Sequence, residues 1–151
     1  MIIKEVETIE EASKCDTLLT NLIMDEKKYN DNIEEVVSII NYYPEIYNKE
    51  GNKLFIALSD NNIVGYIYIK TQSVDGIDKN KDVLIDALYV EEAYRNQGIA
   101  TALINKVKEY AKDNDIKYIS INVLDSNTIA KELYQQLGFK INSLGLKCKD
   151  F

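Results

Sequence analysis

Histidine and tryptophan are both absent from this chain of 151 residues. Without histidine, the chain has no Ser-His-Asp triad, no imidazole base and no histidine-ligated metal site. Its two cysteines, Cys15 and Cys148, lie far apart and form no Cys-x-x-Cys motif, so they predict free thiols and no metal site. Any proton transfer must therefore use carboxylates, tyrosine, lysine, cysteine, water or backbone groups.

Long apolar runs and an excess of positive charge are also missing. No run approaches the roughly 20 apolar residues of a membrane span, and the N-terminus does not resemble a signal peptide. We therefore expect a cytoplasmic protein with no membrane partner. The net charge of −7 argues against nucleic-acid binding, which needs a basic face, and mildly favours a cationic substrate through electrostatic steering. The length suits one domain, 1–151, with one core.

The spacing of apolar residues predicts strands and helices along the whole chain. Strands are expected over 1–6, 54–58, 63–69, 83–90 and 117–123, with a last pair in 139–149. Helices are expected over 8–24, 33–40, 98–112 and 126–137, with Pro44 ending the second helical region. The strand–helix–strand unit from 83 to 123 implies a parallel pair, and the hairpin before it implies antiparallel pairs. The predicted fold class is α/β (α+β), with a mixed, mostly antiparallel sheet of six or seven strands and about four helices.

The turn between strand 83–90 and helix 98–112 has the most informative sequence. It reads Arg-x-x-Gly-x-Ala over residues 95–100. Small residues let an anion approach the main chain, and the start of a helix presents free N–H groups and about half a positive charge. This turn predicts a pyrophosphate site. The single glycine and the lack of Lys-Ser or Lys-Thr after it disfavour a dinucleotide fingerprint and a P-loop.

A second motif lies on the predicted helix 126–137 and its end. Residues 127–139 read Asn-x-x-Ala-x-x-Leu-Tyr-x-x-x-Gly-Phe. Asn127 and Tyr134 are seven residues apart and share a helix face, beside a separate apolar stripe. A tyrosine at the edge of a buried stripe can pack its ring and still present its hydroxyl to a site.

In order and context, the two segments resemble motifs A and B of the GNAT superfamily, the Gcn5-related N-acetyltransferases. The resemblance implies the GNAT fold, in which the two parallel strands splay apart, and acetyl-CoA as the acetyl donor. It implies that the turn binds the pyrophosphate, that strand 88–90 pairs with the pantetheine arm and that Tyr134 stands near the sulfur. The cofactor-binding residues that it implies are Leu88, Tyr89, Val90, Arg95, Asn96, Gln97, Gly98, Ile99, Ala100, Thr101, Asn127 and Tyr134.

The candidate catalytic residues are Tyr134 and Asp86. A tyrosine is protonated at neutral pH and can donate to the departing thiolate. Asp86 interrupts an apolar strand two residues before Leu88, which predicts the same sheet face as Leu88. It is our candidate for the group that accepts the amine proton, directly or through water, or that only binds the amine's charge. The alternative is an exposed carboxylate at a strand end. Asn122 is a further candidate for the cleft.

The expected activity is direct acetyl transfer from acetyl-CoA to a primary amine of a small molecule or peptide. The alternative is a non-catalytic acyl-CoA sensor or interaction module on the same scaffold. The resemblance is also compatible with a homodimer. Four tyrosines fall in the region that covers the acceptor cleft in GNAT proteins, where they either shape the pocket or pack helix ends: Tyr29, Tyr42, Tyr43 and Tyr47.

Overall fold

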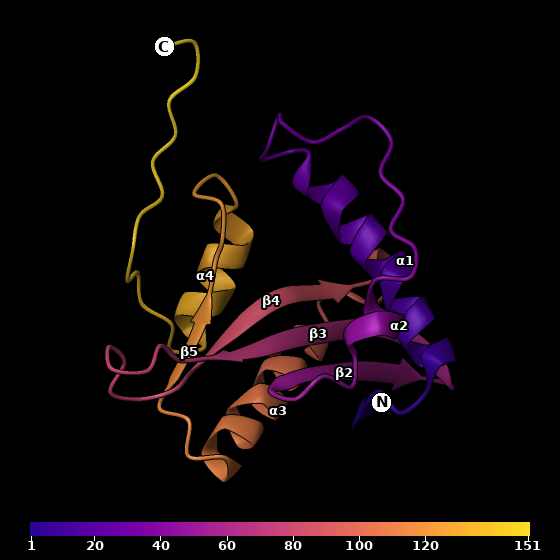
Figure 1. The fold of residues 1–151 in the computed structure, drawn as a ribbon. Coiled ribbons are helices and arrows are strands. Elements are labelled where there is room, and N and C mark those ends of the chain that lie inside the picture. Colours follow the sequence, from indigo (N-terminus) through magenta and orange to yellow (C-terminus); the bar gives the residue numbers. More distant parts are fainter.

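The computed structural model describes residues 1–151 as a five-stranded sheet with helices on both faces (Figure 1). The elements in chain order are β1 (Ile2–Glu5), α1 (Ile9–Glu26), α2 (Tyr43–Ile46), β2 (Asn52–Ser59), β3 (Asn62–Gln72), β4 (Asp82–Val90), the 3-10 turn η1 (Glu92–Tyr94), α3 (Ile99–Asp113), β5 (Tyr118–Ile121) and α4 (Thr128–Gln136). No helix combines the length and the apolar character that a membrane span requires.

The strands lie in the order β1-β2-β3-β4-β5, so each strand pairs with its neighbours in sequence. The first three pairs are antiparallel, and β4 pairs with β5 in parallel, as the sequence predicts. The parallel arrangement follows from α3, which connects β4 to β5 and returns the chain to the same end of the sheet.

Two apolar clusters hold the helices on the sheet. The α3-side cluster consists of Phe55, Ala57, Val64, Ile67, Ile69, Val83, Ile85, Val90, Ile99, Leu103, Ile104, Val107, Ala111 and Ile116. The α1-side cluster consists of Val6, Ala12, Cys15, Leu18, Tyr43, Leu54, Ile56, Tyr66, Tyr68, Ala87 and Tyr89. Along residues 54–57 of β2 and 66–69 of β3, alternate residues enter opposite clusters, which is the expected result for a sheet covered on both faces.

A β-bulge interrupts this alternation in β4. Tyr68 pairs with Ala87 while Ile69 pairs with Ile85, so Asp86 has no partner on β3. Before the bulge, the odd-numbered Ile85 enters the α3-side cluster, and after it the odd-numbered Ala87 enters the α1-side cluster. One extra residue thus reverses the faces of the second half of β4.

The predicted helix over 33–40 is wrong, because this segment has no regular structure. Val36 and Ile40 are 85% and 74% exposed, so the apolar spacing finds no surface to pack against, and a short helix without packing is unstable. The segment contacts α1 instead, through a hydrogen bond from the Ile39 N–H to the Thr20 hydroxyl. Pro44 does not end a helix but stands in the first turn of α2, where its missing N–H removes no bond.

The last predicted strand pair, 139–149, is also absent. Residues 139–151 form no strand, and Figure 1 shows them running away from the sheet. Leu144 and Leu146 are 78% and 94% exposed. A strand exists only with a partner, and this segment lies along no other strand, so the sheet has five strands and not six or seven.

Gly65 allows β3 to approach β4 closely at the C-terminal end of β4, where Gly65 pairs with Val90. A Cβ atom at this position would lie 3.0 Å from the Tyr89 carbonyl oxygen and 3.3 Å from Val90 Cγ2. The oxygen belongs to a paired strand and cannot move aside cheaply.

We expect Gly65→Ala to lower the free energy of unfolding by about 1–3 kcal/mol, the usual effect of overpacking. Urea denaturation measures it. Gly145→Ala is the matched control, because a Cβ atom there has no neighbour within 4 Å. Equal stabilities for the two variants would contradict the close approach.

Candidate active site

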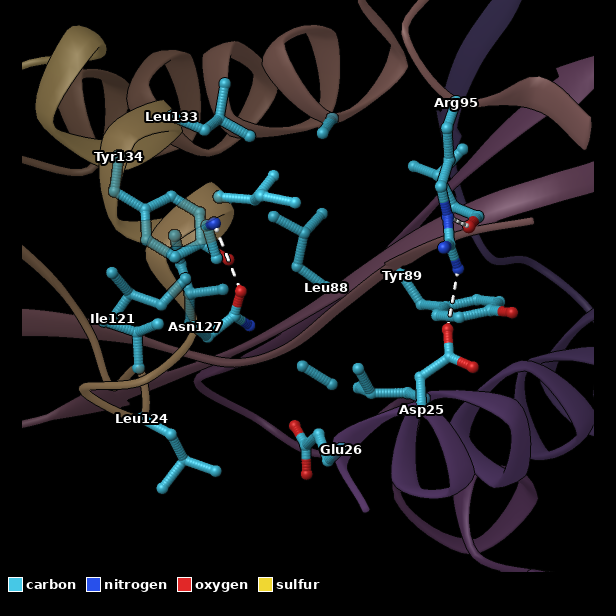
Figure 2. A pocket seen from close by; sticks show the side chains of 18 of the residues that line it. Asp25, Glu26, Leu88, Tyr89, Arg95, Ile121, Leu124, Asn127, Leu133 and Tyr134 are labelled. Carbon is cyan, nitrogen blue, oxygen red and sulfur yellow. Dashed lines mark hydrogen bonds and ion pairs between the residues drawn. The ribbon is translucent and has the colours of Figure 1, made fainter. Parts of the chain in front are cut away.

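A cleft of about 730 Å³ opens where β4 and β5 separate. Its walls are the C-terminal end of α1, the second half of β4, the turn before α3 and the inner face of α4 (Figure 2). All the predicted site residues line it except Gln97, and Asn122 lines it as well. Of the four tyrosines assigned to the acceptor region, Tyr29 alone lines the cleft, while Tyr43 is buried against Tyr66 and Tyr68.

The turn before α3 presents a row of free backbone donors. Asn96 and Gly98 take left-handed conformations, with φ of 62° and 80°. No hydrogen bond inside the chain uses the N–H groups of residues 96–101. Gly98 caps α3 without a side-chain bond, and the first turn of α3 has no acidic residue, so the positive helix end is uncompensated. The turn has the donors and the polarity that an anion needs.

The second half of β4 has a free edge. Pairing with β5 ends at Ile85 and Ile121, but β4 continues to Val90. No strand therefore pairs with residues 86–90 on the side that faces β5. Apart from the Val90 carbonyl oxygen, which accepts a hydrogen bond from Arg95, this backbone can bond an extended ligand as a further strand would.

Arg95 lines the cleft, and its side chain is bound within the protein. Its Nε donates to the Val90 carbonyl oxygen at 2.8 Å, and a terminal nitrogen donates to Asp25 Oδ2 at 2.8 Å (Figure 2). The guanidinium also lies over the Tyr89 ring, 5.3 Å from its centroid. These contacts tie the turn to the last residues of α1. The two hydrogen bonds occupy two of the five N–H donors of the guanidinium, and the backbone N–H groups of residues 96–101 remain free beside it.

Tyr134 enters the cleft from α4. Its ring packs edge-to-face on Phe139, with centroids 6.0 Å apart, and its hydroxyl has no hydrogen-bond partner. Burial, and then the negative charge of Glu26, raise the pKa of Tyr134 to about 12. The hydroxyl therefore keeps its proton at neutral pH.

Asn127 begins α4 and also lines the cleft. Its Oδ1 accepts a hydrogen bond from the Ala130 N–H at 3.3 Å, so the side chain caps the helix that carries Tyr134. The side-chain NH₂ group makes no bond within the chain and is left for a ligand.

Comparison with known proteins identifies the family. A family model described as "Acetyltransferase (GNAT) family" matches residues 17–139. The chain belongs to this family.

Three individual proteins illustrate the relationship. An uncharacterized N-acetyltransferase of Methanocaldococcus jannaschii is 29% identical over 99 residues, which cover 66% of this chain and 44% of that protein. This chain thus spans less than half of that relative. A mutant of the BH1408 protein of Bacillus halodurans has a TM-score of 0.86 at 21% identity, over 100% of both chains. An aminoglycoside N-acetyltransferase solved with CoA has a TM-score of 0.74 at 19% identity, over 99% of both chains, and like BH1408 it supports the GNAT fold.

Asp86 is not on the face that its spacing from Leu88 predicts. The bulge places Asp86 on the α1 side, where its charge raises the pKa values of Tyr66 and Tyr68 after the larger effect of their burial. Leu88 packs on the α3-side cluster. The Asp86 carboxylate is exposed and lies 3.7 Å from Lys70 Nζ. The spacing from Leu88 predicts the wrong face because the sequence carries no sign of the extra residue in β4.

Two acidic residues of this GNAT cleft, Asp25 and Glu26 at the end of α1, are not among the residues predicted from the sequence. Neither belongs to a motif. The available signal was their place at the C-terminal end of a helix, where negative charge is unfavourable and calls for a compensating partner.

We expect Asn127→Ala to lower the free energy of unfolding by about 1 kcal/mol, because the N-cap of α4 is lost. Asn127→Asp is the control, since a carboxylate oxygen caps equally well. Thermal or urea unfolding of the two variants checks this. If both variants lost the same free energy of unfolding, the N-cap hydrogen bond would not be the source of that loss.

Proposed function

We propose that this protein is an N-acetyltransferase that moves the acetyl group of acetyl-CoA directly to a primary amine. One observation carries the proposal: the free N–H groups of Asn96 and of residues 98–101, the unpaired edge of β4 and Tyr134 all lie on one cleft. These are the parts needed to bind a phosphorylated, amide-containing donor and to protonate its leaving group.

The donor end fits acetyl-CoA by its chemistry. A pyrophosphate accepts hydrogen bonds and is negative, which matches the free donors and the positive end of α3. The pantetheine arm carries amides, which match the backbone groups of residues 86–89 that no strand pairs on the β5 side. The remaining NH₂ group of Asn127 is a donor to the same ligand. The aminoglycoside N-acetyltransferase of the same fold was solved with CoA, which agrees with this assignment.

The transfer needs a proton for the sulfur and a place for the protons of the amine. Attack of the neutral amine on the thioester carbon forms a carbon–nitrogen bond, and the carbon–sulfur bond breaks with its electron pair on sulfur. Tyr134 donates its proton to this sulfur and recovers one from the attacking nitrogen. Its high pKa keeps the proton available at neutral pH.

The acceptor is a small-molecule or peptide amine that enters from the α1 side. The cleft wall there carries the carboxylates Asp25, Glu26 and Asp86, which favours a cation. We place Asp86 at the acceptor end of the cleft, where its carboxylate would attract the positive charge of the amine. Lys70 lies beside the same carboxylate. The named structural relative acts on aminoglycosides, which are polycationic amines, and this agrees with such an acceptor.

Tyr134→Phe is expected to lower kcat for acetyl transfer by about 100-fold, since a general acid contributes at least this much. Acetyl-CoA affinity should change little, because the ring and its packing on Phe139 remain. Release of CoA is measured against polyamines, aminoglycosides, amino acids and peptides. Tyr118→Phe is the control, as Tyr118 is exposed outside the cleft. An unchanged kcat on every amine that reacts would remove Tyr134 from the mechanism.

Thr101→Glu is expected to weaken acetyl-CoA binding by about tenfold or more, which corresponds to about 1.4 kcal/mol. The new carboxylate would stand in the first turn of α3, where it repels phosphate. Thr101→Gln has the same shape without the charge and should bind more tightly than Thr101→Glu. Titration calorimetry gives the affinities. The fold should survive, because negative charge at a helix start is stabilising. Equal affinities for the two variants would contradict an anion site at this turn.

The same measurements test the alternative function. Tight acetyl-CoA binding without turnover on any amine of the panel would indicate an acyl-CoA sensor. Loss of both binding and turnover would reject the donor assignment itself.

A further inference from the structure

Glu26 is a carboxylate of the cleft with no partner in the protein. It is the last residue of α1 and is half-buried. Figure 2 shows it entering the cleft from α1, while Tyr134 enters from α4. Its neighbour Asp25 is bound to Arg95, but the Glu26 side chain has no hydrogen bond and no ion pair.

The surroundings of Glu26 disfavour its charge. Burial raises its pKa above the usual range. The C-terminal end of α1 carries partial negative charge, and no basic residue stands in the last turn of the helix. The Glu26 carboxylate thus has no hydrogen bond or ion pair in the protein that would stabilise its charge. A cation that arrives in the cleft would supply the missing partner.

Glu26 also differs from the other two carboxylates that line the cleft. Asp25 is 2.8 Å from Arg95, and Asp86 is 3.7 Å from Lys70, so each already faces a cation. Glu26 is also the one carboxylate whose charge raises the pKa of Tyr134. It therefore lies nearest, in electrostatic terms, to the group that protonates the sulfur.

We propose that Glu26 binds the ammonium group of the acceptor and takes the proton that must leave before the amine can attack. This inference rests on the proposed acetyl transfer. The ammonium gives one proton to the Glu26 carboxylate, which later releases it to solvent. The neutral nitrogen then bonds to the thioester carbon, and its second proton replaces the one that Tyr134 gives to the sulfur. The products are the amide, the CoA thiol and one proton.

The test compares Glu26→Gln with Asp86→Asn and with Glu132→Gln, a change of an exposed glutamate outside the cleft. With saturating acetyl-CoA, Glu26→Gln should lower kcat/KM for the amine by about 100-fold or more. Asp86→Asn should lower it less, and Glu132→Gln should not lower it. Acetyl-CoA affinity should stay at the wild-type value in Glu26→Gln. Its melting temperature should equal or exceed that of the wild type, because an unpaired charge has been removed, so a fall in activity is not a folding defect.

The pH dependence gives a second readout. Glu26 must be ionised to take the proton, so kcat/KM should fall in mild acid as Glu26 becomes protonated, and this limb should vanish in Glu26→Gln. The other titratable groups that line the cleft are Asp25, Lys28, Tyr29, Asp86, Tyr89, Tyr94, Arg95 and Tyr134. Only Asp25 and Asp86 among them are carboxylates, so a limb that vanishes in Asp86→Asn instead would overturn the proposal.

A binding measurement separates this proposal from the proposed function. Spermidine and kanamycin are titrated into the protein with CoA present. The wild type should bind at least one of them, and Glu26→Gln should bind it at least about tenfold more weakly, a loss of about 1.4 kcal/mol. If the wild type transfers acetyl and Glu26→Gln transfers it equally well, the role of Glu26 is rejected and the proposed function stands. Failure of the wild type to transfer acetyl to any amine would reject the proposed function, and failure to bind either cation would reject the role of Glu26.

Discussion

The site depends on one constraint in the sheet, which is that β4 is longer than the strand beside it. Pairing between β4 and β5 stops at Ile85 and Ile121, and the bulge at Asp86 follows at once. From there to Val90 the strand is held by β3 on one side and is free on the other. The turn with its unpaired N–H groups begins where this free edge ends. A longer β5 would close the cleft, and the donor and acceptor ends would lose their common space.

The walls of the cleft are fixed by contacts that have no part in the chemistry. Asp16 is buried and accepts hydrogen bonds from the Tyr42 and Tyr43 N–H groups, which anchors α2 against α1. The buried hydroxyls of Tyr43 and Tyr66, 2.9 Å apart, join α2 to the sheet. Arg95 joins the end of α1 to the end of β4. Opposite them, Lys108 on α3 donates to the Leu137 carbonyl oxygen at the end of α4. These contacts fix the helices and strands that carry the cleft side chains, and precise positioning of reacting groups requires such fixed supports.

The sequence predicted the parts whose structure is local. Strand 83–90, the turn at 95–100 and the two helices that follow were evident from periodicity and motifs. The two helices also make their own backbone hydrogen bonds, so they depend least on the rest of the chain. The helix at 33–40 and the strands after 138 failed because a local pattern cannot tell whether a packing partner exists. The bulge at Asp86 arises from pairing with β3 and leaves no local trace. Glu26 belongs to no motif, and its importance comes from the three elements that meet around it.

The two ends of the cleft differ in their response to acid. The turn at residues 96–101 offers backbone N–H groups, whereas the opposite walls carry carboxylates. Amide N–H groups neither gain nor lose protons in the range where proteins stay folded, and Arg95 keeps its charge throughout. The proposed phosphate site therefore keeps the same donors and the same positive charge over this pH range. Every titrating carboxylate of the cleft lies on its other walls, on α1 and β4. Under the proposed roles of the turn and of Glu26, acidification would leave the protein with its donor bound and inactive, until Glu26 regains its charge.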